Sequence, residues 1–333
     1  MKLRNLLPII GIIILVYIIV TLDFGKILAV LRQIDPLYAF LSFFTLIPLL
    51  ILVNIEWQLL LKRQKIRVSF WYSIKNFFIG YFYGFITPGG FGAYTRSLYL
   101  SEKSGAPLPK CISNIIIFNA IEFVAMMVFG AVGAIFLSSI YPYLFFTIIV
   151  LLAVTFILYL FFFKKERSKK IFERLVRAQI FSTVRDRLEN SIDSFYEDLP
   201  KFKDVLLPFG LSLTGWFLKF IILFFIAKLF SIEISLVYFI FIIAVGDVIS
   251  SIPISIYGIG TRDAALITMF TVFGVAKEPV FSFTLFWFVV FWLTPSIIGA
   301  FVTIRESKKL TKFVLNKDTT KRFEAYMKKH PEL

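Results

Sequence analysis

The sequence is poor in the residues that build covalent cross-links and metal sites. Of its 333 residues, one is a cysteine, Cys111, and one is a histidine, His330. A single thiol excludes an intrachain disulfide and a multi-cysteine zinc site, and a single imidazole excludes zinc, haem and di-iron sites built from several histidines. His330 lies in a charged C-terminal stretch, which argues against a Ser-His-Asp triad. We therefore expect no metal and no cofactor.

Charged residues are also scarce. They make up only 17% of the chain, whereas 59% of the residues are hydrophobic and 42 are phenylalanine. A soluble domain is about 25% charged and about 45–50% apolar, so the composition excludes an ordinary soluble protein and indicates an all-α polytopic membrane protein. The net charge is +15. In a membrane protein this excess indicates a basic cytoplasmic face against anionic lipid, and we expect no nucleic-acid partner.

Six apolar stretches are long enough to cross a bilayer, which takes about 20 residues. They cover residues 6–22, 37–61, 112–137, 143–163, 205–230 and 280–304. The first follows a positive start without a cleavage site, so we interpret it as a retained signal anchor. Clusters of Lys and Arg follow the second, fourth and sixth stretches, and the other connections carry no such excess. The positive-inside rule then predicts a multi-pass protein of the cell membrane with both termini cytoplasmic.

Two further apolar stretches, residues 71–100 and 236–273, are interrupted by proline and glycine. The first is broken at Thr87-Pro88-Gly89-Gly90-Phe91-Gly92, and the second at Pro253 and again at Tyr257-Gly258-Ile259-Gly260. Proline removes a backbone donor and glycine loosens a helix, so we expect the chain to unwind at these points. If the six spans alternate, each broken stretch must return to the face from which it entered. The sequence therefore predicts two re-entrant hairpins.

The two breaks share an order of residues: a proline, then Gly-x-Gly, then an arginine. The first contains Pro88, Gly90, Gly92 and Arg96, and the second contains Pro253, Gly258, Gly260 and Arg262, followed by Asp263. Because the hairpins enter from opposite faces, we predict inverted repeats, with which many transporters build a site at the bilayer midplane. The alternative is two unrelated kinks in a hydrophobic bundle.

Ionisable residues inside apolar stretches are costly and are therefore functional candidates. Arg96 and Arg262 follow the breaks, where a guanidinium and free backbone N–H groups suit a phosphate. Asp263 would hold or neutralise Arg262. Two further candidates lie in the middle of predicted spans: Glu122 in residues 112–137 and Lys219 in residues 205–230. They either pair with each other or serve the substrate.

The remaining candidates near the apolar stretches are acidic or aromatic. Asp247, with Glu122, is a candidate for proton or Na⁺ coupling. Glu56 lies near the inner end of its span, and we expect it to pair with Lys62 or Arg63. Four tyrosines near the breaks are candidates for lining a cavity: Tyr81, Tyr83, Tyr94 and Tyr257.

We take residues 1–304 as one transmembrane transport domain and residues 305–333 as a basic cytoplasmic tail. Within the domain, residues 164–204 form a basic cytoplasmic segment. Its apolar residues recur at roughly helical spacing, which predicts an amphipathic helix on the inner leaflet.

The two motifs and their spacing resemble the transmembrane domain of the lysylphosphatidylglycerol synthase/flippase family, over roughly residues 6–304. The resemblance is to members that lack the soluble synthase domain. It implies a domain that moves lipids between leaflets, with Arg96, Arg262 and the Pro/Gly breaks as functional positions. The chain departs from the family pattern at Ala93, where members usually have Glu, and at Asp263, where Glu is common.

These observations predict a lipid flippase rather than an enzyme, moving an anionic phospholipid or polyprenyl-type lipid through a midplane site. The predicted substrate site comprises Arg96, Arg262, Asp263, Lys219 and the glycines Gly90, Gly92, Gly258 and Gly260. The alternatives are a membrane-embedded lipid-modifying transferase and an accessory subunit of one. Membrane lipids are the expected partners, and a homodimer or a partner enzyme is left open.

Overall fold

The computed structural model describes residues 17, 24–140, 146, 150, 193–252 and 255–314. Within these residues all regular elements are helices, which confirms the expected all-α class. Several predicted segments lie wholly or largely outside the described residues: the spans 6–22 and 143–163, the segment 164–204 as far as residue 192, the tail beyond residue 314, and Pro253.

Four helical segments of the described chain are long and apolar enough to cross a membrane. They are Pro36–Arg63, Leu108–Phe136, Phe202–Lys228 and Lys277–Glu306. They coincide within a few residues with the predicted spans 37–61, 112–137, 205–230 and 280–304. The chain is therefore a multi-pass helical protein.

The four segments correspond to named helices. The first comprises α3 (Pro36–Phe44) and α4 (Leu46–Arg63), preceded by α2 (Phe24–Gln33), and the second is α7 (Leu108–Phe136). The third is α11 (Phe202–Lys228), and the last comprises α14 (Lys277–Phe288), the π-helical turn η5 (Val289–Leu293) and α15 (Thr294–Val314). The start of α3 shows why such boundaries are readable: Asp35 accepts the N–H of Leu37 at 2.8 Å, and Pro36 has no N–H to satisfy.

The first broken stretch forms α5 (Phe70–Ile86), the 3₁₀ helix η2 (Pro88–Thr95) and α6 (Arg96–Ser104). The expected break is present, but the chain stays coiled through it as a tighter helix instead of unwinding. Thr87 makes this possible, because its hydroxyl donates to the carbonyl of Tyr83 at 2.8 Å and accepts the N–H of Gly92 at 2.7 Å. A Cβ on Gly92 would collide with that same Tyr83 carbonyl, so only glycine fits there.

The second broken stretch forms α12 (Leu236–Ser251), the short turn η4 (Ile256–Gly258) and α13 (Thr261–Val272). Gly258 and Gly260 have φ angles of 79° and 84°, which favour glycine, and Tyr257 adopts the same left-handed region at 50°. Asp263 accepts the N–H of Gly260 at 3.0 Å and thereby caps the first turn of α13. The break at residues 257–260 therefore contains three residues in the left-handed region, two of which are its glycines.

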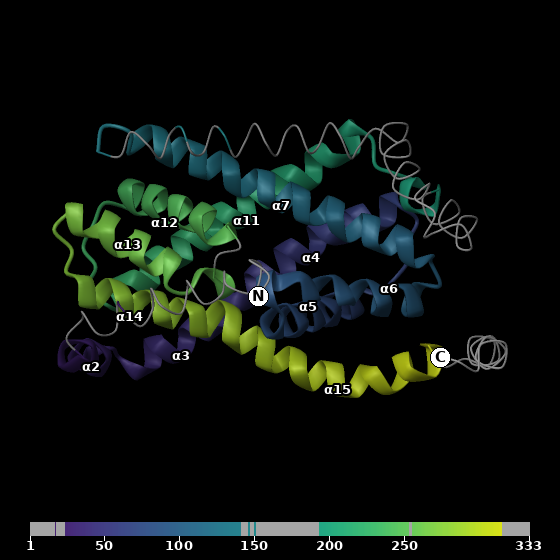
Figure 1. Ribbon diagram of the computed structural model, residues 1–333, viewed down its shortest axis with the longest axis horizontal. Coiled ribbons are helices and arrows are strands. Elements are labelled where there is room, and N and C mark those ends of the chain that lie inside the picture. The colour runs from purple at the N-terminus through teal and green to yellow at the C-terminus, as the bar shows by residue number, and fades with distance from the viewer. Residues whose placement is uncertain are drawn as a thin grey trace, which may run out of the picture.

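The helices pack in a reciprocal pattern. Each half of the chain has a long helix, a broken pair and another long helix: α4, α5–α6 and α7, then α11, α12–α13 and α14–α15. The helix α5 packs along α15 of the second half, α12 packs along α7 of the first half, and α4 packs along α11. Figure 1 shows α5 and α6 toward one end of α7 and α12 and α13 toward the other, and the breaks η2 and η4 are in contact.

Glycines bring the reciprocal helix pairs close together. A Cβ on Gly130 of α7 would collide with Val248 of α12, and a Cβ on Gly133 would lie 2.8 Å from the carbonyl oxygen of Phe241. In the other half, a Cβ on Gly299 of α15 would collide with the carbonyl of Phe78 of α5. Small residues at such contacts let helix backbones approach, which is how helices associate in lipid without a hydrophobic driving force.

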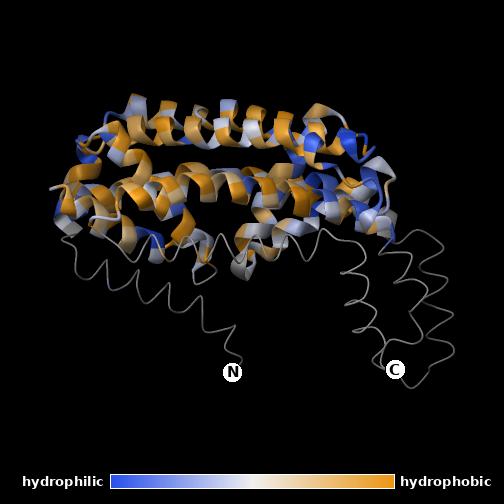
Figure 2. Cartoon of the chain, turned by 90° about the horizontal axis from the view of Figure 1, so that it is seen from above, coloured by the Kyte–Doolittle hydropathy of each residue, from blue (hydrophilic) through white to orange (hydrophobic). Residues whose placement is uncertain are grey.

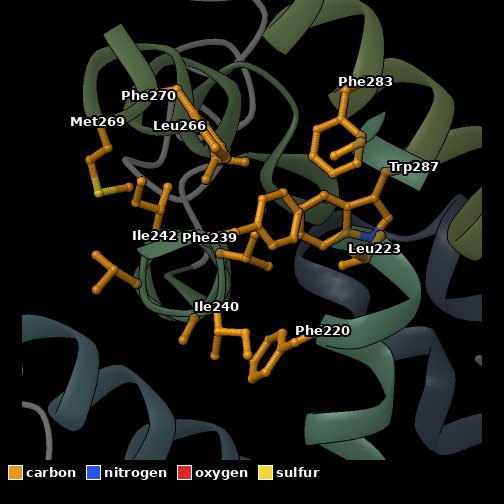
Figure 3. Close-up of a cluster of buried hydrophobic side chains, with 14 of the residues drawn as sticks. Phe220, Leu223, Phe239, Ile240, Ile242, Leu266, Met269, Phe270, Phe283 and Trp287 are labelled. Atoms are coloured by element: carbon orange, nitrogen blue, oxygen red, sulfur yellow. The ribbon is translucent and has the colours of Figure 1, made fainter. Parts of the chain in front are cut away.

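The largest buried cluster joins α7, α11, α12, α13 and α14. Figure 3 shows Phe220 and Leu223 of α11, Phe239 of α12, and Phe283 and Trp287 of α14 within it. The ring centroids of Phe239 and Phe283 lie 6.0 Å apart, as do those of Phe283 and Trp287. This cluster holds Trp287 in place beside Lys219 and Arg262.

Hydrophilic residues gather toward the ends of the bundle, and hydrophobic residues predominate along its length (Figure 2). At one end Asp198 lies 2.8 Å from both Lys65 and Lys110, and Lys110 also pairs with Glu197 at 3.3 Å. The hydrogen bonds from Lys110 and Lys65 hold the pKa of Asp198 below its ordinary value of 3.8. This cluster ties the segment before α11 to the end of α4 and the start of α7.

We predict that Gly299→Ala lowers the thermal stability of the purified protein in detergent. The new Cβ would meet backbone atoms of α5, which cannot move aside as a side-chain end can, and overpacking of this kind costs about 1–3 kcal/mol. The control is Gly210→Ala on α11, where a Cβ has no neighbour within 4 Å and should be neutral or stabilising. Equal melting temperatures for the two variants would contradict the close α5–α15 contact.

We also predict that Asp198→Asn destabilises the protein at neutral pH. Because the folded-state pKa of Asp198 is lowered, its stabilisation is present above 3.8 and is lost as the pH falls through the lowered pKa. Thermal unfolding followed against pH should therefore show a gap between wild type and variant at pH 7 that closes in acid. Glu233→Gln, on the exposed connection between α11 and α12, serves as control and should show no such gap.

Candidate functional site

A cavity of about 380 Å³ lies in the interior, within the size range of small-molecule sites. Residues of α4, α5, α7, α11, α14 and η5 line it, together with both breaks and the start of α6. Most of the lining is aliphatic or aromatic. Three charged residues also line the cavity: Arg96, Glu122 and Lys219.

Arg96 begins α6 directly after the first break and is only 5% exposed. The carbon of its guanidinium lies 5.0, 5.1 and 5.4 Å from the ring centroids of Trp57, Phe77 and Phe118. Its Nη2 donates to Oδ1 of Asn119 at 3.3 Å, and its Nε has no hydrogen-bond partner among the described residues. Aromatic faces stabilise the cation at up to about 2 kcal/mol each. Within the described chain no carboxylate forms a salt bridge with it, so Arg96 can still bind an anion.

Lys219 belongs to α11, and its charge is neutralised by Asp247 of α12. Its Nζ is 2.9 Å from a carboxylate oxygen of Asp247 and lies 4.2 and 5.2 Å from the ring centroids of Trp216 and Trp287. Asp247 itself stands outside the cavity lining. Of the two alternatives left open for Glu122 and Lys219, direct pairing is not what the described residues show, because the ion pair of Lys219 is with Asp247.

Glu122 of α7 instead accepts the indole N–H of Trp216 at 2.9 Å and faces Glu56 of α4. Glu56 is fully buried, and neither of its carboxyl oxygens has a hydrogen-bond partner within the described chain. The expectation that Glu56 pairs with Lys62 or Arg63 is wrong, and Arg63 pairs with Asp204 at 3.4 Å. Six residues, or about 9 Å of helix, separate Glu56 from Lys62, so its side chain stays in the interior.

Arg262 is held by its own neighbours. It is 1% exposed, and its Nε and Nη2 lie 3.3 and 3.1 Å from Oδ1 of Asp263. Nη2 also donates to the carbonyl of Thr284 at 3.3 Å, and the guanidinium carbon lies 4.2 Å from the ring centroid of Trp287. Arg262 and Asp263 are not part of the cavity lining. Their contact with it is indirect, through Trp287, whose indole also faces Lys219.

Sequence comparison identifies the protein family. Residues 8–299 match the family described as the lysylphosphatidylglycerol synthase TM region. The chain belongs to this family. It is also similar to a UPF0104 membrane protein of Methanocaldococcus jannaschii, with 25% identity over 320 residues that cover 89% of this chain and 92% of the relative. The family match confirms the resemblance drawn from the two Pro/Gly motifs.

The family motifs contribute unequally to the cavity. Gly90, with a φ angle of 71°, and Ala93 line it, whereas Gly92, Gly258 and Gly260 shape the breaks from outside the lining. Pro88 opens η2, where a missing N–H costs no helical hydrogen bond. Because position 93 is an alanine, it contributes no charge to the cavity wall.

Several lining residues were missed from the sequence. Trp287 and Trp292 line the cavity, but a tryptophan in an apolar helix carries no sequence signal that separates it from lipid-facing aromatics. Of the four candidate tyrosines, Tyr81 and Tyr257 line the cavity. The ring of Tyr257 stacks on Trp292 at 4.2 Å, and its hydroxyl would collide with a Cβ on Gly84. Through Tyr257 the second break reaches α5.

The described residues contain no group of three or more His, Cys, Asp or Glu side chains placed to hold a metal ion. The charged groups at the cavity are thus the guanidinium of Arg96, the ammonium of Lys219 neutralised by Asp247, and the carboxyl group of Glu122 paired with Glu56.

We predict that Asp247→Asn destabilises the protein strongly, because it leaves the buried ammonium of Lys219 without its carboxylate. Removal of one partner from a buried pair costs about 3–5 kcal/mol, whereas replacement of both by apolar residues is often neutral. The double variant Lys219→Met/Asp247→Leu should therefore melt closer to wild type than Asp247→Asn does. Additive losses in the double variant would show that the two side chains do not interact.

Proposed function

We propose that this protein moves an anionic lipid between the two leaflets of the cell membrane, with the lipid phosphate bound at Arg96. The observation that supports this most strongly is the state of Arg96. It is a buried cation on a cavity wall, its charge rests on aromatic rings, and one of its N–H groups has no partner within the described chain. A phosphate oxygen is the ligand that a guanidinium in this state lacks.

The two faces of α4 support a lipid, and not a water-soluble anion, as the substrate. Leu46, Leu49 and Val53 of this helix line the cavity. Ile47 and Ile51 of the same helix are 51% and 40% exposed on the outer surface. The cavity wall and the lipid-facing surface are thus adjacent on one helix, so a headgroup in the cavity and acyl chains in the bilayer can belong to one molecule.

The reciprocal packing supports an inverted-repeat transporter. If α5 corresponds to α12 and α7 to α14–α15, exchange of the two halves converts the α5–α15 contact into the α12–α7 contact. We infer six spans and two re-entrant hairpins that enter from opposite faces and meet at η2 and η4. Both termini would then be cytoplasmic, and the cavity beside the hairpin tips would lie near the midplane.

The remaining charged residues have supporting roles in this proposal. Lys219 lies on the cavity wall with its charge balanced by Asp247. Arg262 and Asp263 brace Trp287, and Glu122 and Asp247 are the candidates for ion coupling. The proposed function is that of a transporter and not of an enzyme.

The test is leaflet exchange of headgroup-labelled phosphatidylglycerol in proteoliposomes. We expect wild type to accelerate exchange and Arg96→Gln to slow it by about tenfold or more, because a charge-assisted hydrogen bond contributes about 1.5–3 kcal/mol. The matched control is Lys228→Gln, which removes an exposed positive charge at the end of α11 and should leave the rate unchanged.

Two results would count against the proposal. Exchange at the wild-type rate by a folded Arg96→Gln variant would remove Arg96 from the site. If vesicles with wild-type protein exchange neither phosphatidylglycerol nor a polyprenyl phosphate faster than empty vesicles do, the flippase function is contradicted. A new lipid of shifted mass in the same vesicles would favour the lipid-modifying transferase.

A further inference from the structure

The carboxyl groups of Glu56 and Glu122 form a buried pair that the binding of a lipid phosphate does not require. They come from α4 and α7 and face one another, with Glu122 on the cavity wall and Glu56 behind it. Within the described residues, both oxygens of Glu56 and Oε1 of Glu122 have no assigned hydrogen-bond partner. Three acceptor oxygens without a hydrogen-bond donor among the described residues are thus gathered at this place.

Neighbouring helices tie the pair in place. Trp57, next to Glu56, donates its indole N–H to Asn114 of α7 at 2.7 Å, and Asn114 donates to Gln64 of α4 at 2.7 Å. These bonds hold α4 against α7, the two helices that carry the carboxyl groups. The contact is therefore built into the interface and is not a chance approach of two mobile side chains.

Two ionised carboxylates cannot remain in contact in a buried site, because both are acceptors and their charges repel. One proton resolves both problems, since it turns one carboxyl into a donor and lowers the charge of the pair from −2 to −1. A shared proton is how closely spaced buried carboxyl groups are generally satisfied. The step is a carboxylate plus a proton giving a carboxylic acid, and no electrons move.

The charged and titratable groups around the pair come from each packed helix. From α5 there is Tyr81, from α6 Arg96, from α11 Lys219, and from α12 Asp247. Lys219 is engaged by Asp247 at 2.9 Å, and Arg96 bonds to Asn119 at 3.3 Å, so neither forms a salt bridge with the pair. The N–H of Trp216 points at Glu122, which suits a proton-sharing carboxyl and opposes a metal cation at the same oxygens.

We propose that Glu56 and Glu122 are a proton-binding site that couples lipid movement to the proton gradient. This rests on the proposed flippase function. Arg96 contacts Asn119, which is one turn before Glu122 on α7. A phosphate at Arg96 places negative charge near the pair and favours its protonated form, so the anion and the proton bind together and cross together.

The site itself is tested by infrared difference spectra of the purified protein across pH steps. Wild type and the control Glu233→Gln should show a buried carboxylic-acid band that disappears as the pH rises. Each of Glu56→Gln and Glu122→Gln should shift the pH at which the band disappears, and the double variant should lack it. Glutamine preserves side-chain volume, and size-exclusion elution checks folding. The same band in a folded double variant would overturn the proposal.

The coupling is tested by leaflet exchange under an imposed pH gradient. Wild type should move labelled lipid toward the alkaline side, with a rate that changes by up to about tenfold per pH unit, as expected for one proton. The double variant should show no dependence on the gradient, and Glu122→Asp should restore part of it. Lipid movement in wild type without pH dependence would overturn the coupling alone. Failure of wild type to move lipid would overturn the flippase function and its coupling, and the infrared band would still decide the proton site.

Discussion

A charge buried among apolar helices must be balanced inside the protein, because no bulk water is available to solvate it. The described interior meets this constraint in four different ways. Arg262 has Asp263, Lys219 has Asp247, Arg96 has three aromatic faces, and the pair of Glu56 and Glu122 requires a proton. The first two solutions are complete within the chain. Arg96 and the carboxyl pair can each still bind a ligand, an anion or a proton, and the proposed function is therefore placed at these residues.

The two family arginines therefore have different roles despite their matching positions. Asp263 follows Arg262 and accepts a hydrogen bond from its guanidinium. Ser97 follows Arg96 and has no carboxylate. Arg96 instead lies among Trp57, Phe77 and Phe118, which attract the cation without hydrogen-bonding it. The two arginines follow breaks of different backbone geometry, and the neighbouring side chains leave Arg262 paired with a carboxylate and Arg96 without one among the described residues.

The frame itself depends on close helix contacts. Gly130 and Gly133 bring α12 onto α7, and Gly299 brings α5 onto α15. These contacts position the two breaks against each other, so that Tyr257 of the second break reaches Gly84 of α5. A site assembled from both halves can change shape when the halves move, which is the geometric requirement for alternating access.

The sequence by itself determined the membrane class, the four spans that the structure describes, the positions of both breaks and the presence of buried charges. Each of these rests on local information, namely hydropathy over about 20 residues or the backbone limits of proline and glycine. Only the tertiary structure decided which charges meet. The partner of Lys219, the interior position of Glu56 and the roles of Trp287 and Trp292 depend on how each helix is rotated about its axis. In a chain that is apolar on nearly every face, hydropathy does not specify that rotation, and packing between helices sets it.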